Sequence, residues 1–357
     1  KPDYAEVNYN LGLTLQELER LDAAVKCYEK AIAIQPDYAE AHNNLGVTLK
    51  ELDQLDAAVE CYEKALAIKP DYAEAHNNLG LTLQKLDQVD AAVESYKKAL
   101  AVDPDYAEVN YNLGLALQEL DQLDAAVEYY EKAIAIQPDY AEAHNNLGNV
   151  LKDLGQLDAA VKSYEKAIAT QPDYVEAHNN LGSIFMELGQ MDDAVKSYEK
   201  ALALKPNDAD GYNKLGIVYM ELDQTDVALK CYKKALALNP DNAKAHANRG
   251  DAMKRLNRLD EALASYESAI ALNPNLDYVF NDYLHTRMNL CIWDDLASNL
   301  NELTSKVNNG EKALNPFIAL ALIDDPEIQR KAAEIYANKE YPQSHVLPKI
   351  ERYQKHK

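Results

Sequence analysis

The segment Asp37–Pro70 reads DYAEAHNNLGVTLKELDQLDAAVECYEKALAIKP, and it decides the fold. In its first half, apolar and small residues recur at the spacing of one helix face. In its second half, Ala58, Tyr62 and Ala65 lie at i, i+4 and i+7, which places them on one face of a second helix. Asp53 lies between the halves, where helices commonly end in a residue that tolerates positive φ. The segment therefore predicts a helical hairpin whose apolar faces can be buried only against neighbours.

Acidic residues stand near both expected helix starts. Asp37 followed by Glu40 fits a capping box at the first helix. Asp56 places a carboxylate at the start of the second, where it complements the helix dipole. Pro36 cannot continue the preceding helix, so it marks the boundary between hairpins.

The same pattern recurs with a period of 34 residues. Proline follows this step at Pro2, Pro36, Pro70, Pro104, Pro138, Pro172, Pro206, Pro240 and Pro274. Glycine follows it at Gly12, Gly46, Gly80, Gly114, Gly148, Gly182, Gly216 and Gly250. A fixed period of this size is the signature of a solenoid, which grows by stacking and not around one core. We therefore expect an all-α, right-handed solenoid of eight hairpins.

Tyrosine is strongly favoured over the other aromatic residues, with 24 Tyr against 3 Phe and 1 Trp. One column, expected in the core, is Tyr28, Tyr62, Tyr96, Tyr130, Tyr164, Tyr198, Tyr232 and Tyr266. A second, expected in a core site near the turn, is Tyr4, Tyr38, Tyr72, Tyr106, Tyr140 and Tyr174. The excess of tyrosine is thus a property of the repeat.

The expected organisation has four parts. Residues 1–274 form eight repeats, and residues 275–309 form a degenerate ninth repeat or capping hairpin. Residues 310–340 form a helical extension, with one helix on each side of Asp325-Pro326. Residues 341–357 read as a linker towards a further C-terminal domain.

Composition excludes several classes of function. The 36 Lys and Arg against 59 Asp and Glu give a formal charge of −23, which disfavours nucleic acid. No apolar run is long enough to cross a membrane. The 4 cysteines form no close pair, so neither a disulfide scaffold nor a zinc site is expected. With no signal peptide, we expect a cytoplasmic protein.

Nothing in the sequence predicts catalysis or a cofactor. It contains no Gly-rich phosphate loop, no nucleophile elbow and no cluster of metal ligands. The carboxylates lie in repeat columns and not in one convergent site. We therefore expect no enzyme activity from these residues, no cofactor and no bound metal.

A column of asparagines is the candidate binding site. With the equivalent of Ala39 as position 1 of each repeat, position 6 holds Asn10, Asn44, Asn78, Asn112, Asn146, Asn180 and Asn248, with Lys214 in the seventh repeat. Asparagine is a mediocre helix former, so its recurrence needs a reason. One interpretation is a hydrogen bond to the neighbouring helix. The other is a ladder of amides along a groove, which would bind the backbone of an extended peptide.

A column of histidines occupies position 4, at His42, His76, His144, His178 and His246. Neighbouring repeats lie about 10 Å apart, the spacing of packed helices, whereas zinc needs ligands at about 2 Å from one point. The column therefore indicates part-buried packing residues and no metal site.

The eighth repeat is unusually basic, with Lys244, Arg249, Lys254, Arg255 and Arg258 near Lys214 of the seventh. One hypothesis is that Lys214, Lys244, Lys254 and Arg255 contact an acidic partner or a following domain. The alternative is a solvated face of the helix with snorkelling side chains.

These residues resemble the tetratricopeptide repeat. Leu45, Gly46, Ala58, Tyr62, Ala65 and Pro70 match its positions 7, 8, 20, 24, 27 and 32. The departures are His or Asn in place of Trp at position 4 and Leu49 in place of Tyr at position 11. The resemblance covers about 274 residues and implies a module that binds proteins or peptides.

The asparagine column narrows the resemblance to the N-terminal repeat arm of bacterial O-linked N-acetylglucosaminyltransferases and of Spindly-like proteins. The stretches LCIWDDL (Leu290 to Leu296) and NPFIAL (Asn315 to Leu320) are similar to the bridge before the catalytic domain of that family. The resemblance implies that the seven asparagines bind substrate polypeptide for a glycosyltransferase parent. The alternative is an independent scaffold for protein complexes. Self-association through exposed terminal repeats is a further expectation.

Overall fold

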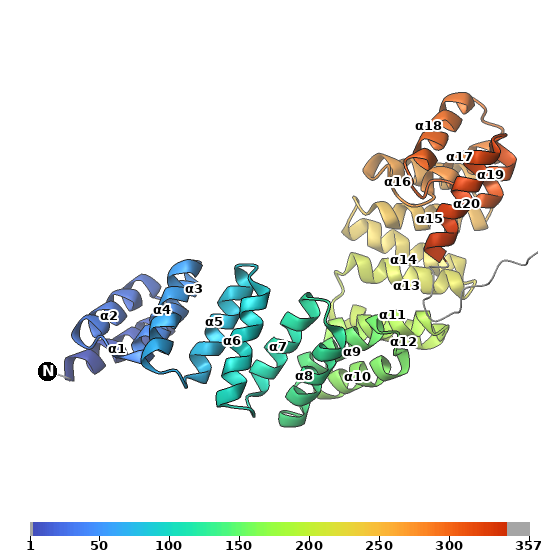
Figure 1. The fold of residues 1–357 in the computed structure, drawn as a ribbon. Helices are drawn as coiled ribbons and strands as arrows, with labels where there is room; N and C mark the ends of the chain where they lie inside the picture. Colours follow the sequence, from blue (N-terminus) through green and yellow to red (C-terminus); the bar gives the residue numbers. More distant parts are fainter. Residues whose placement is uncertain (1–2, 341–357) are drawn as a thin grey trace, which may run out of the picture. The chain divides into compact units, whose positions relative to one another are not determined.

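The computed structural model describes residues 3–340, and every secondary-structure element in that range is an α-helix (Figure 1). The predicted all-α solenoid of paired helices is therefore confirmed. Close contacts divide the chain into two compact bodies, Lys1–Ile184 and Phe185–Lys357. We call them the N-terminal and C-terminal bodies.

Each repeat is a hairpin of two helices, the A helix and the B helix. The A helices are α1 (Asp3–Glu17), α3 (Ala39–Glu51), α5 (Ala73–Lys85), α7 (Ala107–Glu119), α9 (Ala141–Asp153), α11 (Val175–Glu187), α13 (Ala209–Glu221) and α15 (Ala243–Arg255). The B helices are α2 (Leu21–Ile34), α4 (Leu55–Ile68), α6 (Val89–Val102), α8 (Leu123–Ile136), α10 (Leu157–Thr170), α12 (Met191–Leu204), α14 (Thr225–Leu238) and α16 (Leu259–Leu272). Successive A helices also contact each other, as α1 with α3 and α13 with α15. The A helices thus line one face of each body.

The turn inside each hairpin has the backbone conformation that the sequence predicts. Asp53 has φ 60°, and Gly155 at the equivalent position has φ 73°. Glu19 also has a positive φ, of 55°, although this conformation is uncommon for residues other than glycine, asparagine and aspartate. The geometry of the turn therefore overrides the preference of this residue.

The predicted capping box is wrong. Helix α3 begins at Ala39, and the residue before it, Tyr38, makes no side-chain cap. Asp37 lies one residue too early because the turn brings the N–H of Tyr38 onto the carbonyl of Gln35. Asp56 is in the first turn of α4, as expected for its interaction with the dipole.

Side-chain caps appear where the tyrosine before the A helix is replaced. Asp208 accepts a hydrogen bond from the N–H of Gly211, and Asn242 accepts one from the N–H of Ala245. These residues directly precede α13 and α15. The cap is therefore a property of the residue directly before the helix.

The two tyrosine columns have different environments. All eight tyrosines of the first column are at most 1% exposed, so they are core residues as predicted. The second column was expected in the core, but Tyr38 is only half-buried and Tyr4 is 58% exposed. Tyr38 packs against the ring of Tyr9 with centroids 5.0 Å apart. Because it precedes the helix, it covers the edge of the hairpin and not its centre.

The glycine at position 8 makes room for the buried tyrosine of the same hairpin. A Cβ atom added to Gly114 would lie 2.7 Å from Cε1 of Tyr130, and one added to Gly46 would lie 2.7 Å from Cε1 of Tyr62. Such distances are well below van der Waals contact. The glycine of the Leu-Gly pair is therefore required by the close approach of the A helix to the tyrosine ring.

Four helices follow the eighth repeat: α17 (Val279–Asn289), α18 (Leu296–Asn308), α19 (Pro316–Leu322) and α20 (Pro326–Glu340). They share an apolar core that includes Leu284, Leu303, Val307 and Leu314. Helices α19 and α20 lie on either side of Asp325. Whether α17 and α18 are a degenerate repeat stays a prediction, and the expected linker 341–357 lies outside the described residues.

We predict that Gly114→Ala lowers the free energy of unfolding by about 1–3 kcal/mol, because the added methyl group overpacks the Tyr130 ring. In an ordinary helix the same change would raise stability by about 1 kcal/mol. Urea unfolding followed by circular dichroism measures the difference. The penalty should shrink when Tyr130→Leu makes room. An equal penalty in both backgrounds would contradict the proposed steric cause.

Candidate functional site

The asparagine column connects neighbouring repeats. In six of its members, Nδ2 donates to the side chain at position 5 of the preceding repeat. The pairs are Asn44 to Tyr9 (2.9 Å), Asn78 to Asn43 (3.1 Å), Asn112 to Asn77 (3.1 Å), Asn146 to Tyr111 (2.9 Å), Asn180 to Asn145 (3.1 Å) and Asn248 to Asn213 (2.9 Å). The hydrogen bond to the neighbouring helix, one of the two interpretations, is therefore present. Some of their remaining groups are also engaged: Nδ2 of Asn180 donates to Asn149 as well (3.0 Å), and the amide oxygen of Asn44 accepts from Asn43 (3.2 Å). The carboxamide of Asn44 has one N–H and one lone pair beyond these bonds.

Two positions of the column, the first and the seventh, differ from the rest. Asn10 is exposed on α1, and Lys214 is exposed on α13. Asn112 is only 5% exposed, and the other paired members are half-buried. A role in peptide binding stays a prediction for all seven asparagines, and Asn112 is the least accessible of them.

The histidine column also connects neighbouring repeats. Nε2 of His42 lies 3.0 Å from the carbonyl oxygen of Pro36, the residue that closes the preceding repeat. Equivalent contacts join His76, His144, His178 and His246 to Pro70, Pro138, Pro172 and Pro240. In the fourth repeat, Asn110 Nδ2 lies 3.4 Å from the carbonyl oxygen of Pro104 and takes the place of histidine. Position 4 therefore binds the carbonyl of the proline in the turn between one hairpin and the next.

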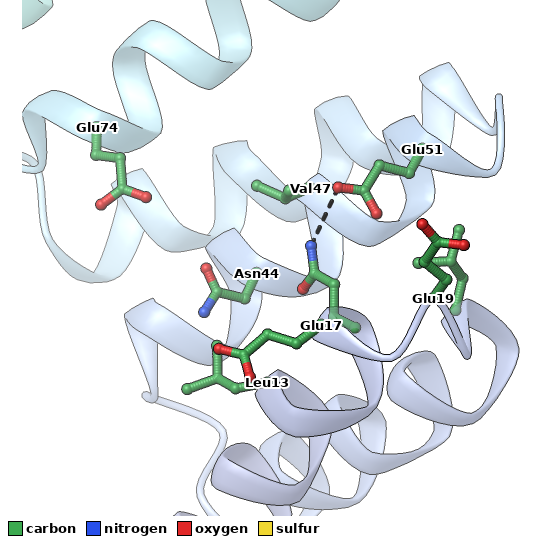
Figure 2. Close-up of a pocket in the computed structure, with 9 residues that line it drawn as sticks. Leu13, Glu17, Glu19, Asn44, Val47, Glu51 and Glu74 are labelled. Carbon is green, nitrogen blue, oxygen red and sulfur yellow. Dashed lines mark hydrogen bonds between the residues drawn. The ribbon is translucent and has the colours of Figure 1, made fainter.

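A groove of about 820 Å³ lies on the A-helix face of the N-terminal body. Figure 2 shows Glu17 from α1, Asn44 and Glu51 from α3, and Glu74 from α5 on its lining. Leu13 and Val47, both at position 9, provide apolar surface. One member of the asparagine column therefore borders an open, acidic groove.

Hydrogen bonds fix part of this lining. Gln16 Nε2 donates to a carboxylate oxygen of Glu51 (3.2 Å), while its amide oxygen accepts from the hydroxyl of Tyr28 (3.0 Å). Asn43 Nδ2 lies 3.3 Å from a carboxylate oxygen of Glu74. Among the described residues, no lysine or arginine is on the lining of the groove, so no positive charge of that lining neutralises the carboxylates.

A second groove, of about 500 Å³, lies in the C-terminal body. Lys244 and Asn248 border it, together with Asp251 at position 9. The carboxylate of Asp251 accepts a hydrogen bond from the Tyr266 hydroxyl (2.6 Å), and desolvation raises the pKa of Asp251 to about 6. The asparagine column thus borders a groove in both bodies.

Two of the four basic candidates make contacts within the chain. Lys254 Nζ pairs with the carboxylate of Asp282 at 2.8 Å. Arg255 donates to the carbonyl of Met220 (2.7 Å) and pairs with Asp223 (2.9 Å). Lys254 therefore joins α15 to α17, and Arg255 joins α15 to α13 and the turn after it. Lys214 and Lys244 are exposed, and contact with a partner stays a prediction for all four.

The sequence did not reveal the acceptors at position 5 or the groove residues at positions 9, 12 and 13. A signal was present for the first, since Asn43-Asn44 and Asn77-Asn78 repeat as pairs. The groove has no such signal, because it depends on how three successive A helices stack.

Sequence models of the tetratricopeptide repeat match residues 3–71, 40–105, 71–139, 129–162 and 213–277, and a further TPR repeat model matches 148–189 and 182–223. The chain belongs to the tetratricopeptide repeat proteins. Members of this class bind proteins and peptides and are typically non-catalytic.

Several solved structures are similar to parts of the chain. Two crystal structures of MamA are 32% and 31% identical, with TM-scores of 0.44 and 0.45. They cover 46% and 48% of this chain, and 97% and 94% of their own. YrrB, described as a TPR protein with an unusual peptide-binding site, is 22% identical over 55% of this chain and 97% of its own, with a TM-score of 0.46. No curated protein matches the chain.

Residues 3–340 lack two features, a membrane-spanning helix and a cluster of metal ligands. No helix in this range is long and apolar enough to cross a membrane. The same range holds no group of three or more His, Cys, Asp or Glu side chains placed to bind a metal ion.

We predict that Asn112→Ala lowers the free energy of unfolding by about 1 kcal/mol, because the buried amide oxygen of Asn77 loses its donor. Asn10→Ala is the matched control, since Asn10 is exposed at the same repeat position. Urea unfolding of both variants tests the difference. Equal stabilities would show that the bond between repeats contributes nothing measurable.

Acid should destabilise the stack through His76. Burial lowers the pKa of this imidazole, and its buried Nδ1 finds no hydrogen-bond partner among the described residues. Because the folded pKa lies below the unfolded value of about 6.5, the unfolded chain binds more protons as the pH falls through that value. The contribution of the neutral His76 to the free energy of unfolding is therefore fully present above about pH 6.5 and is lost as the pH falls below that value.

The variant His76→Asn copies Asn110, which makes the same backbone contact without titrating. We expect its urea midpoint to fall less than that of the parent between about pH 7.5 and about pH 5.5. Identical pH profiles of parent and variant would contradict a role for His76.

Proposed function

We propose that the chain is an interaction scaffold that holds an extended polypeptide segment on its A-helix face. The observation that carries this proposal is the position of the asparagine column beside open grooves, with Asn44 in one and Asn248 in the other. An extended chain offers one N–H and one C=O per residue, and a carboxamide can pair with either. A regular column of amides therefore suits a ligand with a regular backbone.

The bonds between repeats support this proposal, because they restrict the orientation of each carboxamide. A side chain held at Nδ2 loses less conformational entropy when its remaining N–H or oxygen binds a ligand. The same asparagine thus stabilises the stack and presents a fixed polar group. Asn44, half-buried and on the lining of a groove, is the best-placed member.

A more specific role, as the substrate-recognition arm of a protein O-glycosyltransferase, rests on the sequence resemblance alone. It stays a prediction about a parent protein. Reading the encoded sequence beyond Lys357 tests it directly. An α/β domain in that position would support the role, and a stop codon would reject it.

The location of the binding face can be tested with peptides of 12 residues selected from a random displayed library against the full chain. We expect Val47→Trp, which blocks the groove, to weaken binding about tenfold or more. Ile68→Trp is the matched control, since Ile68 is exposed on B helix α4. Loss of binding in the Ile68 variant, with the Val47 variant unaffected, would move the site to the B helices.

A further inference from the structure

The lining of the N-terminal groove combines two chemical features that one type of side chain can satisfy. Leu13 and Val47 provide apolar surface, while Glu17, Glu51 and Glu74 provide carboxylates. The side chains of lysine and arginine have an aliphatic stem and a cationic head. A stem on the apolar surface would bring the head to the carboxylates, where a charge-assisted hydrogen bond forms.

In the next repeat, lysine residues of the chain itself occupy two of the equivalent positions. Gln16, at position 12, is replaced there by Lys50, and Glu51, at position 13, is followed one repeat later by Lys85. Glu74 corresponds to Glu108. Lys50 is half-buried, and its ammonium group lies within the electrostatic influence of Glu51 and Glu108. In that repeat the protein thus supplies its own cations, whereas the described lining of the groove beside Gln16 holds no lysine or arginine.

The hydrogen bonds of the buried tyrosines depend on whether position 12 holds glutamine or lysine. The hydroxyl of Tyr28 donates to the amide oxygen of Gln16, and that of Tyr96 donates to Gln84. The hydroxyl of Tyr62 lacks an equivalent amide acceptor, because Lys50 replaces glutamine in its repeat. The fold therefore accepts either residue at position 12, and glutamine, although it donates to Glu51, brings no positive charge to the carboxylates.

We infer that the groove formed by α1, α3 and α5 recognises a lysine or arginine side chain of an extended polypeptide. The cationic head lies among Glu17, Glu51 and Glu74, and the stem lies on Leu13 and Val47. This inference rests on the proposed function, since it names the class of segment that the A-helix face selects. The partner is thus a basic segment, to which the chain charge of −23 adds long-range attraction.

The test uses the full chain and three fluorescein-labelled peptides of 12 residues with a Ser-Gly background. One carries four lysines, one carries norleucine in their place, and one carries glutamate. We expect the lysine peptide to bind at least about tenfold more tightly than the norleucine peptide in fluorescence anisotropy. Equal affinities of the lysine and norleucine peptides would overturn the inference.

The first variant removes the three carboxylates by Glu17→Gln, Glu51→Gln and Glu74→Gln. Its matched control makes the same change in net charge on the B helices, by Glu29→Gln, Glu63→Gln and Glu131→Gln. We expect about a tenfold loss of affinity for the lysine peptide in the groove variant and less than about twofold in the control. Equal losses would show that only the overall charge attracts the peptide.

The second variant, Gln16→Lys, gives the groove the arrangement that the next repeat already has. All carboxylates remain, so we expect the internal ammonium group to weaken binding of the lysine peptide several-fold while the norleucine peptide is unaffected. Unchanged binding of the lysine peptide in a variant of parental helicity would overturn the inference.

The same experiments separate the two proposals. Binding of lysine and norleucine peptides with equal affinity, both blocked by Val47→Trp, would reject the choice of a basic segment but retain the A-helix face. If the Val47→Trp variant still bound these peptides as the parent does, the A-helix face would be rejected as the binding site as well.

Discussion

The structure depends on the contact between the glycine at position 8 and the tyrosine at position 24. The ring of Tyr130 lies so close to Gly114 that no side chain larger than hydrogen fits without movement. This contact sets the separation of the two helices in the hairpin. The next A helix packs on the B helix that carries the tyrosine, so the same contact sets the spacing of successive repeats. The groove on the A-helix face follows from that spacing.

Polar contacts between repeats then fix the register of the stack. Position 4 binds the carbonyl of the closing proline, and position 6 binds the side chain at position 5 of the preceding repeat. Both contacts join atoms from adjacent hairpins. Apolar faces alone would tolerate small sliding movements, whereas a hydrogen bond weakens steeply when its geometry is lost. The asparagine column, which the sequence offered as a binding site, is therefore also a connection between the repeats, as the histidine column is.

Local chemistry made most of the fold predictable. The 34-residue period, the two helices of each hairpin, the positive φ at Asp53 and the buried Tyr62 each follow from residue spacing. The capping box failed because Asp37 satisfies a sequence motif while the helix begins two residues later, at Ala39. The half-burial of Tyr38, the partners of Lys254 and Arg255 and the acidic groove could not be predicted, since each depends on residues about one repeat away. The asparagine column was visible in the sequence, but its acceptors at position 5 were identified only in the structure.

The central claim is that the A-helix face binds an extended basic segment while the asparagines continue to join the repeats. A crystal structure of the full chain with the lysine peptide tests this most directly. We expect a lysine ammonium within about 4 Å of at least two of the carboxylates of Glu17, Glu51 and Glu74. We also expect Asn44 to donate to Tyr9 as it does in the free chain. A peptide bound along α2 and α4, or a complex in which the bond between Asn44 and Tyr9 is broken, would contradict it.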